Sequence, residues 1–123
     1  MKARGVESVL VTGGAGFIGS HTVDVLLAKG YGVTVLDNLE PQVHGRIKRP
    51  PGYLTKDAAF VRGTMQDRAL VKKLVLNSDA VIHLAAMVGV GQSMYQVERY
   101  VDANTRGTSV LLDVLANEDH GVK

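Results

Sequence analysis

Four glycines between Leu10 and Ser20 form a pattern that could bind a phosphate group. They interrupt an apolar run, and an amphipathic segment follows them. A strand that turns through glycines into a helix offers an anion unpaired N–H groups and a positive helix end. Glycines also let a phosphate approach without a Cβ in the way. Gly14, Gly16 and Gly19 have the Gly-x-Gly-x-x-Gly spacing of the dinucleotide-binding fingerprint. Gly13, Gly16 and Gly19 have a related spacing, Gly-x-x-Gly-x-x-Gly, over the same turn. The four residues are Gly13, Gly14, Gly16 and Gly19.

An acidic residue lies where such a fold would hold an adenosine ribose. Asp37 follows a short apolar run, eighteen positions after Gly19, which is close to the ~20-residue spacing of the carboxylate that meets the ribose. A carboxylate accepts hydrogen bonds from both ribose hydroxyls but repels a 2′-phosphate. Asn38 adds no positive charge, so the pair favours NAD over NADP. The alternative interpretation is that Asp37 and Asn38 only cap a loop.

Small and polar residues near two later predicted elements suggest further ligand contacts. Ala85 and Ala86 follow the apolar run Ala80–Leu84, and small residues at the carboxyl end of a strand leave room for a ligand. Packing alone is the other explanation. Asn104 interrupts the apolar face of the last predicted helix. Its amide needs a partner, which a bound cofactor or the strand ends would supply.

Alternating apolar patterns predict an α/β fold. The predicted strands cover residues 6–12, 33–36, 59–62 and 79–85, and the predicted helices cover 17–29, 67–76 and a long segment from 93 that breaks near 98. Residues 38–57, which hold all three prolines, are expected to form a long surface connection, and 87–92 a loop. This alternation indicates a doubly wound parallel sheet. The Rossmann strand order 3-2-1-4 brings Gly13, Gly16, Asp37 and Ala85 together at one crevice.

Composition narrows the class of protein. The 123 residues are expected to form one domain over residues 1–123, because hydrophobic residues make up 46% and charged residues 21%. A net charge of +2 gives no argument for binding nucleic acid or a membrane surface. There is no cysteine, and no apolar run approaches the ~18 residues of a membrane span. These features are compatible with a cytoplasmic protein.

Four motifs in order resemble the extended short-chain dehydrogenase/reductases, the NAD-dependent epimerase/dehydratase family that acts on nucleotide sugars. The resemblance runs from about Val9 to Lys123. Segments 41–45 and 88–95 are most similar to those of sugar 4-epimerases, including one that acts on dTDP-L-rhamnose. The motifs are Thr-Gly-x-x-Gly-x-x-Gly at Thr12–Gly19, Asp37-Asn38, His-Leu-Ala-Ala at His83–Ala86, and Asn104 followed by Gly107-Thr108 and Leu111-Leu112.

The resemblance implies an NAD site whose residues can be named by position. In the intact enzymes, NAD takes a hydride from C4 of the sugar, and its return to the opposite face gives epimerisation. Thr64 and Met65 stand where the family usually has an Asp for the adenine amino group, and Val88 stands where UDP-galactose 4-epimerases commonly have Lys. The implied pyrophosphate residues are Gly13, Gly16, Phe17, Ile18 and Gly19. The others are Asp37 and Asn38 at the ribose, Leu84, Ala85 and Ala86 beneath the cofactor, and Asn104 from the last helix.

The family's catalytic pair is absent from these 123 residues. It is a Tyr with a Lys four residues later, in which the Tyr acts as general base. Tyr53 has Lys56 one residue too close, and Tyr95 is followed at that spacing by Arg99. The expectation is therefore the NAD-binding part of a nucleotide-sugar 4-epimerase or 4,6-dehydratase, truncated before a fifth strand and catalytically inactive alone. A homodimer or a self-associating fragment is also expected, through the exposed sheet edge or the last helix. A non-catalytic NAD-binding module and a cofactor-free interaction domain are the alternatives.

Overall fold

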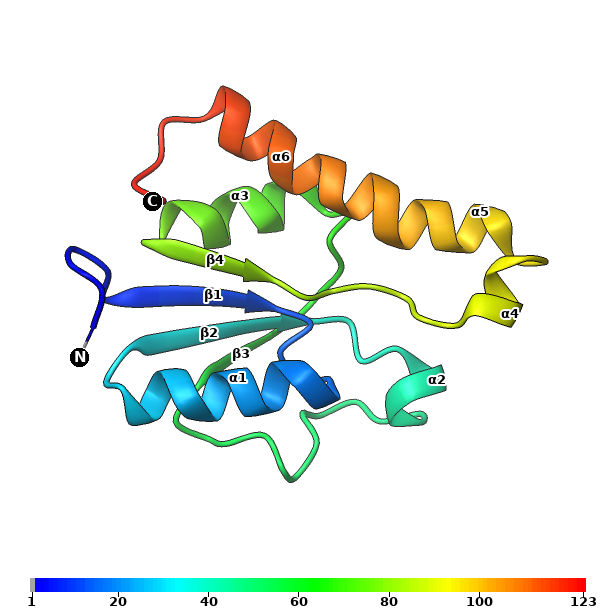
Figure 1. Ribbon diagram of the computed structural model, residues 1–123, viewed down its shortest axis with the longest axis horizontal. Helices are drawn as coiled ribbons and strands as arrows, with labels where there is room; N and C mark the ends of the chain where they lie inside the picture. Colours follow the sequence, from blue (N-terminus) through cyan, green and yellow to red (C-terminus); the bar gives the residue numbers. More distant parts are fainter. Residues whose placement is uncertain (1) are drawn as a thin grey trace.

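The computed structural model describes residues 2–123 and has a four-stranded parallel sheet (Figure 1). The strand order is β3-β2-β1-β4, which confirms the predicted order 3-2-1-4. Register runs from Val9 beside Val33 and Ala80 to Thr12 beside Leu36 and His83. The strands are β1 (Ser8–Thr12), β2 (Gly32–Asp37), β3 (Ala59–Arg62) and β4 (Ala80–His83).

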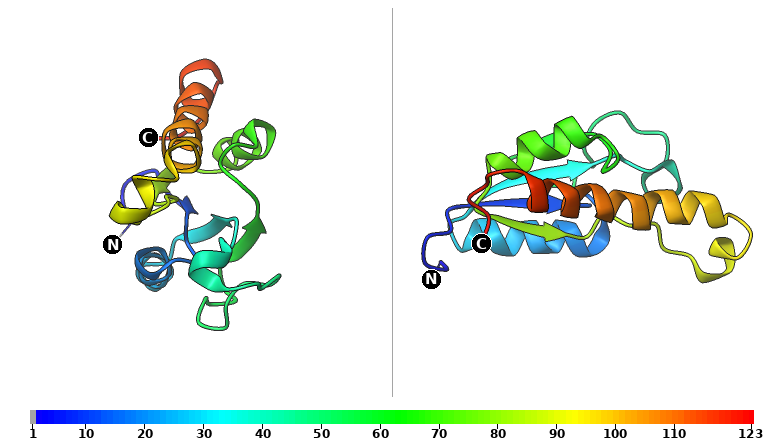
Figure 2. Two further views of the ribbon diagram at one scale, coloured as in Figure 1. Left: turned by 90° about the vertical axis from the view of Figure 1, so that its right-hand side faces the viewer. Right: turned by 90° about the horizontal axis from the view of Figure 1, so that it is seen from above.

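The helices cover both faces of the sheet. Figure 2 shows α1 on one side and α3 with α6 on the other, as a doubly wound fold requires. Asp67 caps α3 by accepting a hydrogen bond from the Leu70 N–H at 3.0 Å. The helices are α1 (Phe17–Ala28), α2 (Pro41–His44), α3 (Arg68–Leu76), α4 (Val90–Ser93), α5 (Val97–Tyr100), the π-helix η1 (Val101–Arg106) and α6 (Gly107–Asn117).

Strand β1 lies between two hydrophobic cores. Val9 and Val11 belong to the core beneath α1, and Leu10 belongs to the core beneath α3 and α6. Leu10 and Val11 have no exposed surface. An apolar strand that is buried on both faces is typical of the centre of a parallel sheet.

The connection between β2 and β3 differs from the surface loop predicted for residues 38–57. It contains the single helical turn α2, and the side chains of Leu39 and Leu54 are buried in the core beneath α1. Two apolar residues fifteen positions apart have no helical or strand period, so pattern analysis does not detect their burial.

The last helical region is also more divided than predicted. Helix α4 begins at Val90, inside the predicted loop, and the break falls between Ser93 and Val97 instead of near Glu98. A π-helix then separates α5 from α6. Apolar spacing does not reveal a π-helix, which arises from one extra residue in a turn. The first strand begins at Ser8, two residues later than predicted.

Gly19 lies against the turn that joins β1 to α1. A Cβ at this position would overlap the carbonyl oxygen of Gly13 and would lie 2.7 Å from the Gly14 Cα. Both are backbone atoms, which cannot move without displacing the turn. Gly32 offers a matched comparison, because the nearest atom to a Cβ there is the Glu7 carbonyl oxygen at 3.7 Å.

We expect Gly19→Ala to lower the free energy of unfolding by about 1–3 kcal/mol, the usual cost of overpacking. Gly32→Ala should change it by less than about 0.5 kcal/mol. Urea unfolding followed by circular dichroism measures both. Equal stabilities would show that the turn moves freely to admit the Cβ.

Asp79 joins the amino ends of β1 and β4. Its Oδ2 accepts hydrogen bonds from the N–H groups of Glu7 and Ser8 and from the Ser8 hydroxyl, each at 2.9 Å. These bonds hold the pKa of the Asp79 carboxyl below its usual value, and the two backbone donors have the largest effect.

We expect Asp79→Asn to lower the thermal unfolding midpoint at pH 7. A pKa that is lower in the folded state means that the carboxylate stabilises the fold fully above the unfolded-chain pKa of about 3.9. This contribution disappears as the pH falls through the lower folded value. The difference in thermal unfolding midpoint between wild type and Asp79→Asn should therefore become smaller below about pH 4. A gap that stays constant from pH 7 to pH 3 would contradict a role for the charge.

Candidate functional site

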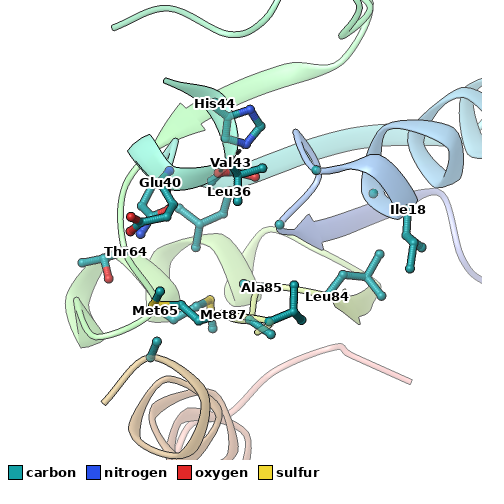
Figure 3. A pocket seen from close by; sticks show the side chains of 18 of the residues that line it. Ile18, Leu36, Glu40, Val43, His44, Thr64, Met65, Leu84, Ala85 and Met87 are labelled. Carbon is teal, nitrogen blue, oxygen red and sulfur yellow. Dashed lines mark hydrogen bonds and ion pairs between the residues drawn. The ribbon is translucent and has the colours of Figure 1, made fainter. Parts of the chain in front are cut away.

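A cleft of about 390 Å³ opens at the carboxyl ends of the strands. The β1–α1 turn, the end of β2 and the segment after β4 form its walls. Figure 3 shows Glu40, Val43 and His44 on one wall, facing Met65, Ala85 and Met87 on the other. Ligands of doubly wound folds bind at this edge, where strand order reverses. Here the reversal lies between β1 and β4.

The glycine turn brings backbone close to backbone. Gly13 has φ +68°, and a Cβ there would lie 2.7 Å from the Ala85 nitrogen. A side chain at 13 would therefore separate the ends of β1 and β4. The first helical bond of α1 runs from the Ser20 N–H to the Gly16 carbonyl at 2.9 Å. The amides that precede Ser20 in the helix are those available to an anion.

Asp37 fastens the end of β2 to the glycine turn. Its Oδ2 accepts from the Ala15 N–H at 3.0 Å, and its Oδ1 accepts from the Leu39 N–H at 2.8 Å. The residue is 8% exposed and lines the cleft. Each carboxylate oxygen retains a further lone pair, so the two backbone bonds orient the group and leave it able to accept from a ligand.

His83 forms a chain of hydrogen bonds behind the end of β4. The Thr108 hydroxyl donates to the Asn104 carbonyl at 2.6 Å, so it accepts from His83 Nε2 at 3.0 Å. The Thr12 hydroxyl lies 2.6 Å from Nδ1 and accepts from the Leu84 and Ala85 N–H groups at 3.1 and 3.2 Å. Burial lowers the pKa of His83, which favours the neutral ring with one donor and one acceptor that this chain needs.

The π-helix positions the loop after β4. The Asn104 side chain accepts from the Met87 N–H at 2.7 Å and donates to the Met87 carbonyl at 2.9 Å. Its neighbour Ala103 lines the cleft. π-Helical turns are frequent at functional sites. The polar partner expected for the Asn104 amide is therefore the backbone of Met87, which belongs to the wall of the cleft.

Polar side chains join the two walls outside the cleft. Arg99 of α5 donates to Glu40 at 2.6 Å, and the amides of Gln42 and Gln92 pair with each other at 2.6 and 2.9 Å. Gln92 also accepts from the Tyr100 hydroxyl at 2.9 Å. These bonds connect the segment after β2 with the helices after β4.

The structure brings twelve of the thirteen predicted cofactor residues to one cleft. Asn104 is the exception, because it supports the wall through Met87. Thr64 hydrogen-bonds with Gln66, and Met65 is 5% exposed. The twelve lining residues are Gly13, Gly16, Phe17, Ile18, Gly19, Asp37, Asn38, Thr64, Met65, Leu84, Ala85 and Ala86. Their contact with a cofactor stays a prediction.

Sequence reasoning did not select several other lining residues. Glu40 and His44 come from the segment expected to be a surface loop, so no pattern placed them at the cleft. Leu36 and Met87 adjoin predicted site residues, and their proximity was a usable signal. Val88 was named only as a departure from the family's Lys, and the lining residues that were not predicted are Leu36, Glu40, Val43, His44, Gly63, Gln66, Met87 and Ala103.

Within residues 2–123, no helix combines the length and apolarity needed to cross a membrane.

Comparisons with known proteins support a shared architecture. A family model described as GDP-mannose 4,6 dehydratase matches residues 10–123. A UDP-glucose 4-epimerase of Haemophilus influenzae is 44% identical over 110 residues, which are 85% of this chain and 32% of the relative. The crystal structure of UDP-glucose 4-epimerase from Brucella ovis in complex with NAD has a TM-score of 0.75 and 37% identity, over 88% of this chain and 31% of that one. A dTDP-glucose 4,6-dehydratase from Streptomyces venezuelae, crystallised with NAD, has a TM-score of 0.76 and 35% identity, over 93% of this chain and 37% of that one.

The chain spans about a third of the length of these relatives. The family match covers every strand residue from Leu10 onward and every element that lines the cleft. On this basis the chain belongs to the GDP-mannose 4,6-dehydratase family of NAD-dependent epimerases and dehydratases.

Proposed function

We propose that the chain binds NAD in the cleft and is the cofactor-binding part of a nucleotide-sugar 4-epimerase or 4,6-dehydratase. The observation that carries the proposal is the meeting of the glycine turn at the start of α1 with Asp37 at the end of β2, on the walls of one cleft. In this proposal, residues 1–123 form one NAD-binding domain.

The residues that line the cleft fit a dinucleotide. Among residues 2–123 and apart from its chain neighbours, the Gly13 oxygen at 3.3 Å is the one atom within 4 Å of a Cβ built at Gly16. We infer that a pyrophosphate occupies the space beside this glycine. The amides of Phe17 and Ile18 begin α1 and would bind the phosphate oxygens. Asp37 would accept from the adenosine ribose hydroxyls, and Thr64 and Met65 would adjoin the adenine.

The chain's own contribution is to bind and orient the cofactor. Bound NAD supplies a hydride acceptor for C4 of the sugar. His83 and Thr12 fix the Leu84 and Ala85 amides, so the floor of the cleft is held in position. The identity of the sugar, including dTDP-L-rhamnose, stays a prediction from the resemblance, as does dimer formation.

Gly16 allows binding to be separated from folding. Its φ of −73° and ψ of 177° are open to any residue, whereas Gly13 and Gly19 are closed to side chains. We expect Gly16→Val to weaken NAD binding at least tenfold, about 1.4 kcal/mol, and to leave the circular dichroism spectrum unchanged. Titration calorimetry gives the dissociation constants.

Gly32→Ala is the control for this experiment, because Gly32 lies at the opposite end of the sheet and its substitution should leave NAD affinity as it is in wild type. A folded wild-type protein that binds no NAD would overturn the proposed function. Equal affinities in wild type and Gly16→Val would remove the glycine turn from the site.

The purified chain should show no sugar epimerisation by itself. Neither Tyr53 nor Tyr95 has a Lys four residues later, so the chain does not carry the family's general base. We expect no conversion of UDP-glucose or dTDP-glucose when NAD-loaded protein is incubated with either sugar and the products are separated by chromatography. Product formation that Gly16→Val abolishes would contradict this expectation.

A further inference from the structure

His44 lies beside Asp37, the carboxylate predicted to bind the adenosine ribose. Its Nε2 is 3.9 Å from Asp37 Oδ1, and the two side chains are only 4% and 8% exposed. Both residues line the cleft, and Figure 3 shows His44 next to Val43 on that wall. A charge on this imidazole would therefore act on Asp37 with little screening by solvent.

Tyr53 closes a ring of contacts around the same group. Its hydroxyl donates to the Ala15 carbonyl at 2.5 Å and lies 3.4 Å from His44 Nδ1. The Ala15 N–H in turn donates to Asp37. Burial and then the charge of Asp37 raise the pKa of Tyr53, so the phenol stays a neutral donor. We call Ala15, Asp37, His44 and Tyr53 the Asp37 ring.

His44 is the only imidazole among the four residues of the Asp37 ring. Imidazole is the side chain that ordinarily changes charge between about pH 5 and 8, whereas the Tyr53 phenol stays neutral there. Oxygen atoms of Asp37 and Tyr53 face its two nitrogens. When His44 is neutral, the Asp37–His44 pair carries one negative charge, and when His44 is protonated, the pair is neutral overall.

We propose that His44 is a coenzyme-specificity residue that sets how strongly Asp37 rejects a 2′-phosphate. The proposal rests on NAD occupying the cleft with its adenosine ribose at Asp37. With His44 protonated, the negative charge that opposes the extra phosphate of NADP is offset. Discrimination between NAD and NADP therefore weakens as the pH falls, and it strengthens as His44 loses its proton.

The other charged side chains near this wall are carboxylates, guanidinium groups and an ammonium group. Glu40 is paired with Arg99 at 2.6 Å, and Arg62 of β3 is in register with Asp37. Carboxylates and guanidinium or ammonium groups with ordinary pKa values do not titrate between pH 6 and 8. The remaining charged residues of the segment between His44 and Tyr53 are Arg46, Lys48 and Arg49.

The test compares the pH dependence of two affinities. Dissociation constants for NAD and NADP are measured by titration calorimetry at pH 6 and pH 8, in wild type and in His44→Asn. The 2′-phosphate gains a proton near pH 6, so the preference for NAD falls with pH in both proteins. Between pH 8 and pH 6, we expect the preference for NAD over NADP to fall about tenfold further in wild type than in His44→Asn. A tenfold change is the effect of one pKa unit of interaction between the His44 charge and the 2′-phosphate.

His120→Gln is the matched control, because His120 contacts the Leu115 carbonyl near the end of the chain and lies outside the cleft lining. It should behave as wild type. The same pH dependence in wild type and His44→Asn would overturn the proposal, whereas absence of NAD binding by folded wild type would overturn the proposed function instead.

A second measurement needs no variant. In wild type with labelled histidines, the His44 ring signal is followed by NMR as a function of pH, with NAD or with NADP. We expect NADP to move the His44 titration midpoint upward relative to NAD, because the 2′-phosphate stabilises the protonated ring. Identical midpoints with the two coenzymes would also overturn the proposal.

Discussion

The close approach of Gly13 to the start of the segment after β4 is the contact on which the cleft depends. Gly13 has φ +68°, and a Cβ at this position would lie 2.7 Å from the Ala85 nitrogen, so only glycine lets the end of β1 lie this close to Ala85. The Gly13 N–H meanwhile donates to the Leu36 carbonyl of β2 at 2.8 Å. One residue therefore ties the ends of three strands together, and α1 must begin directly above them. The open space beside Gly16 follows from that geometry.

The sheet was predictable because its signals are local. β3 has the predicted bounds Ala59–Arg62, and α3 ends at Leu76 as predicted. The segment after β2 was not predictable in the same way. Leu39 and Leu54 are buried, yet their burial follows from tertiary packing against the core beneath α1 and not from any period in the sequence. The π-helix was missed because one inserted residue leaves apolar spacing almost unchanged.

Some residues of the candidate site were also predictable from local sequence, and others were not. Residues whose role depends on backbone shape, such as Gly13 and Asp37, are marked by residue type and spacing. Residues whose role depends on tertiary contacts cannot be identified from residue type and spacing. The sequence indicated that the Asn104 amide needs a hydrogen-bond partner, but only the structure identifies the Met87 backbone as that partner. His44 was not selected as a site residue, because its contacts with Asp37 and Tyr53 arise from the tertiary packing of the connection between β2 and β3.

The polar contacts that join the cleft walls bear on the kinetics of ligand exchange. The Glu40–Arg99 ion pair and the Gln42–Gln92 amide pair are the ties between the α2 segment and the helices after β4, and all four side chains reach solvent. Exposed pairs of this kind contribute about 0–1 kcal/mol each. Breaking the two pairs would therefore cost little free energy in comparison with unfolding of the domain. A ligand whose exchange requires these pairs to break would therefore have a residence time set by its own contacts and not by unfolding of the domain.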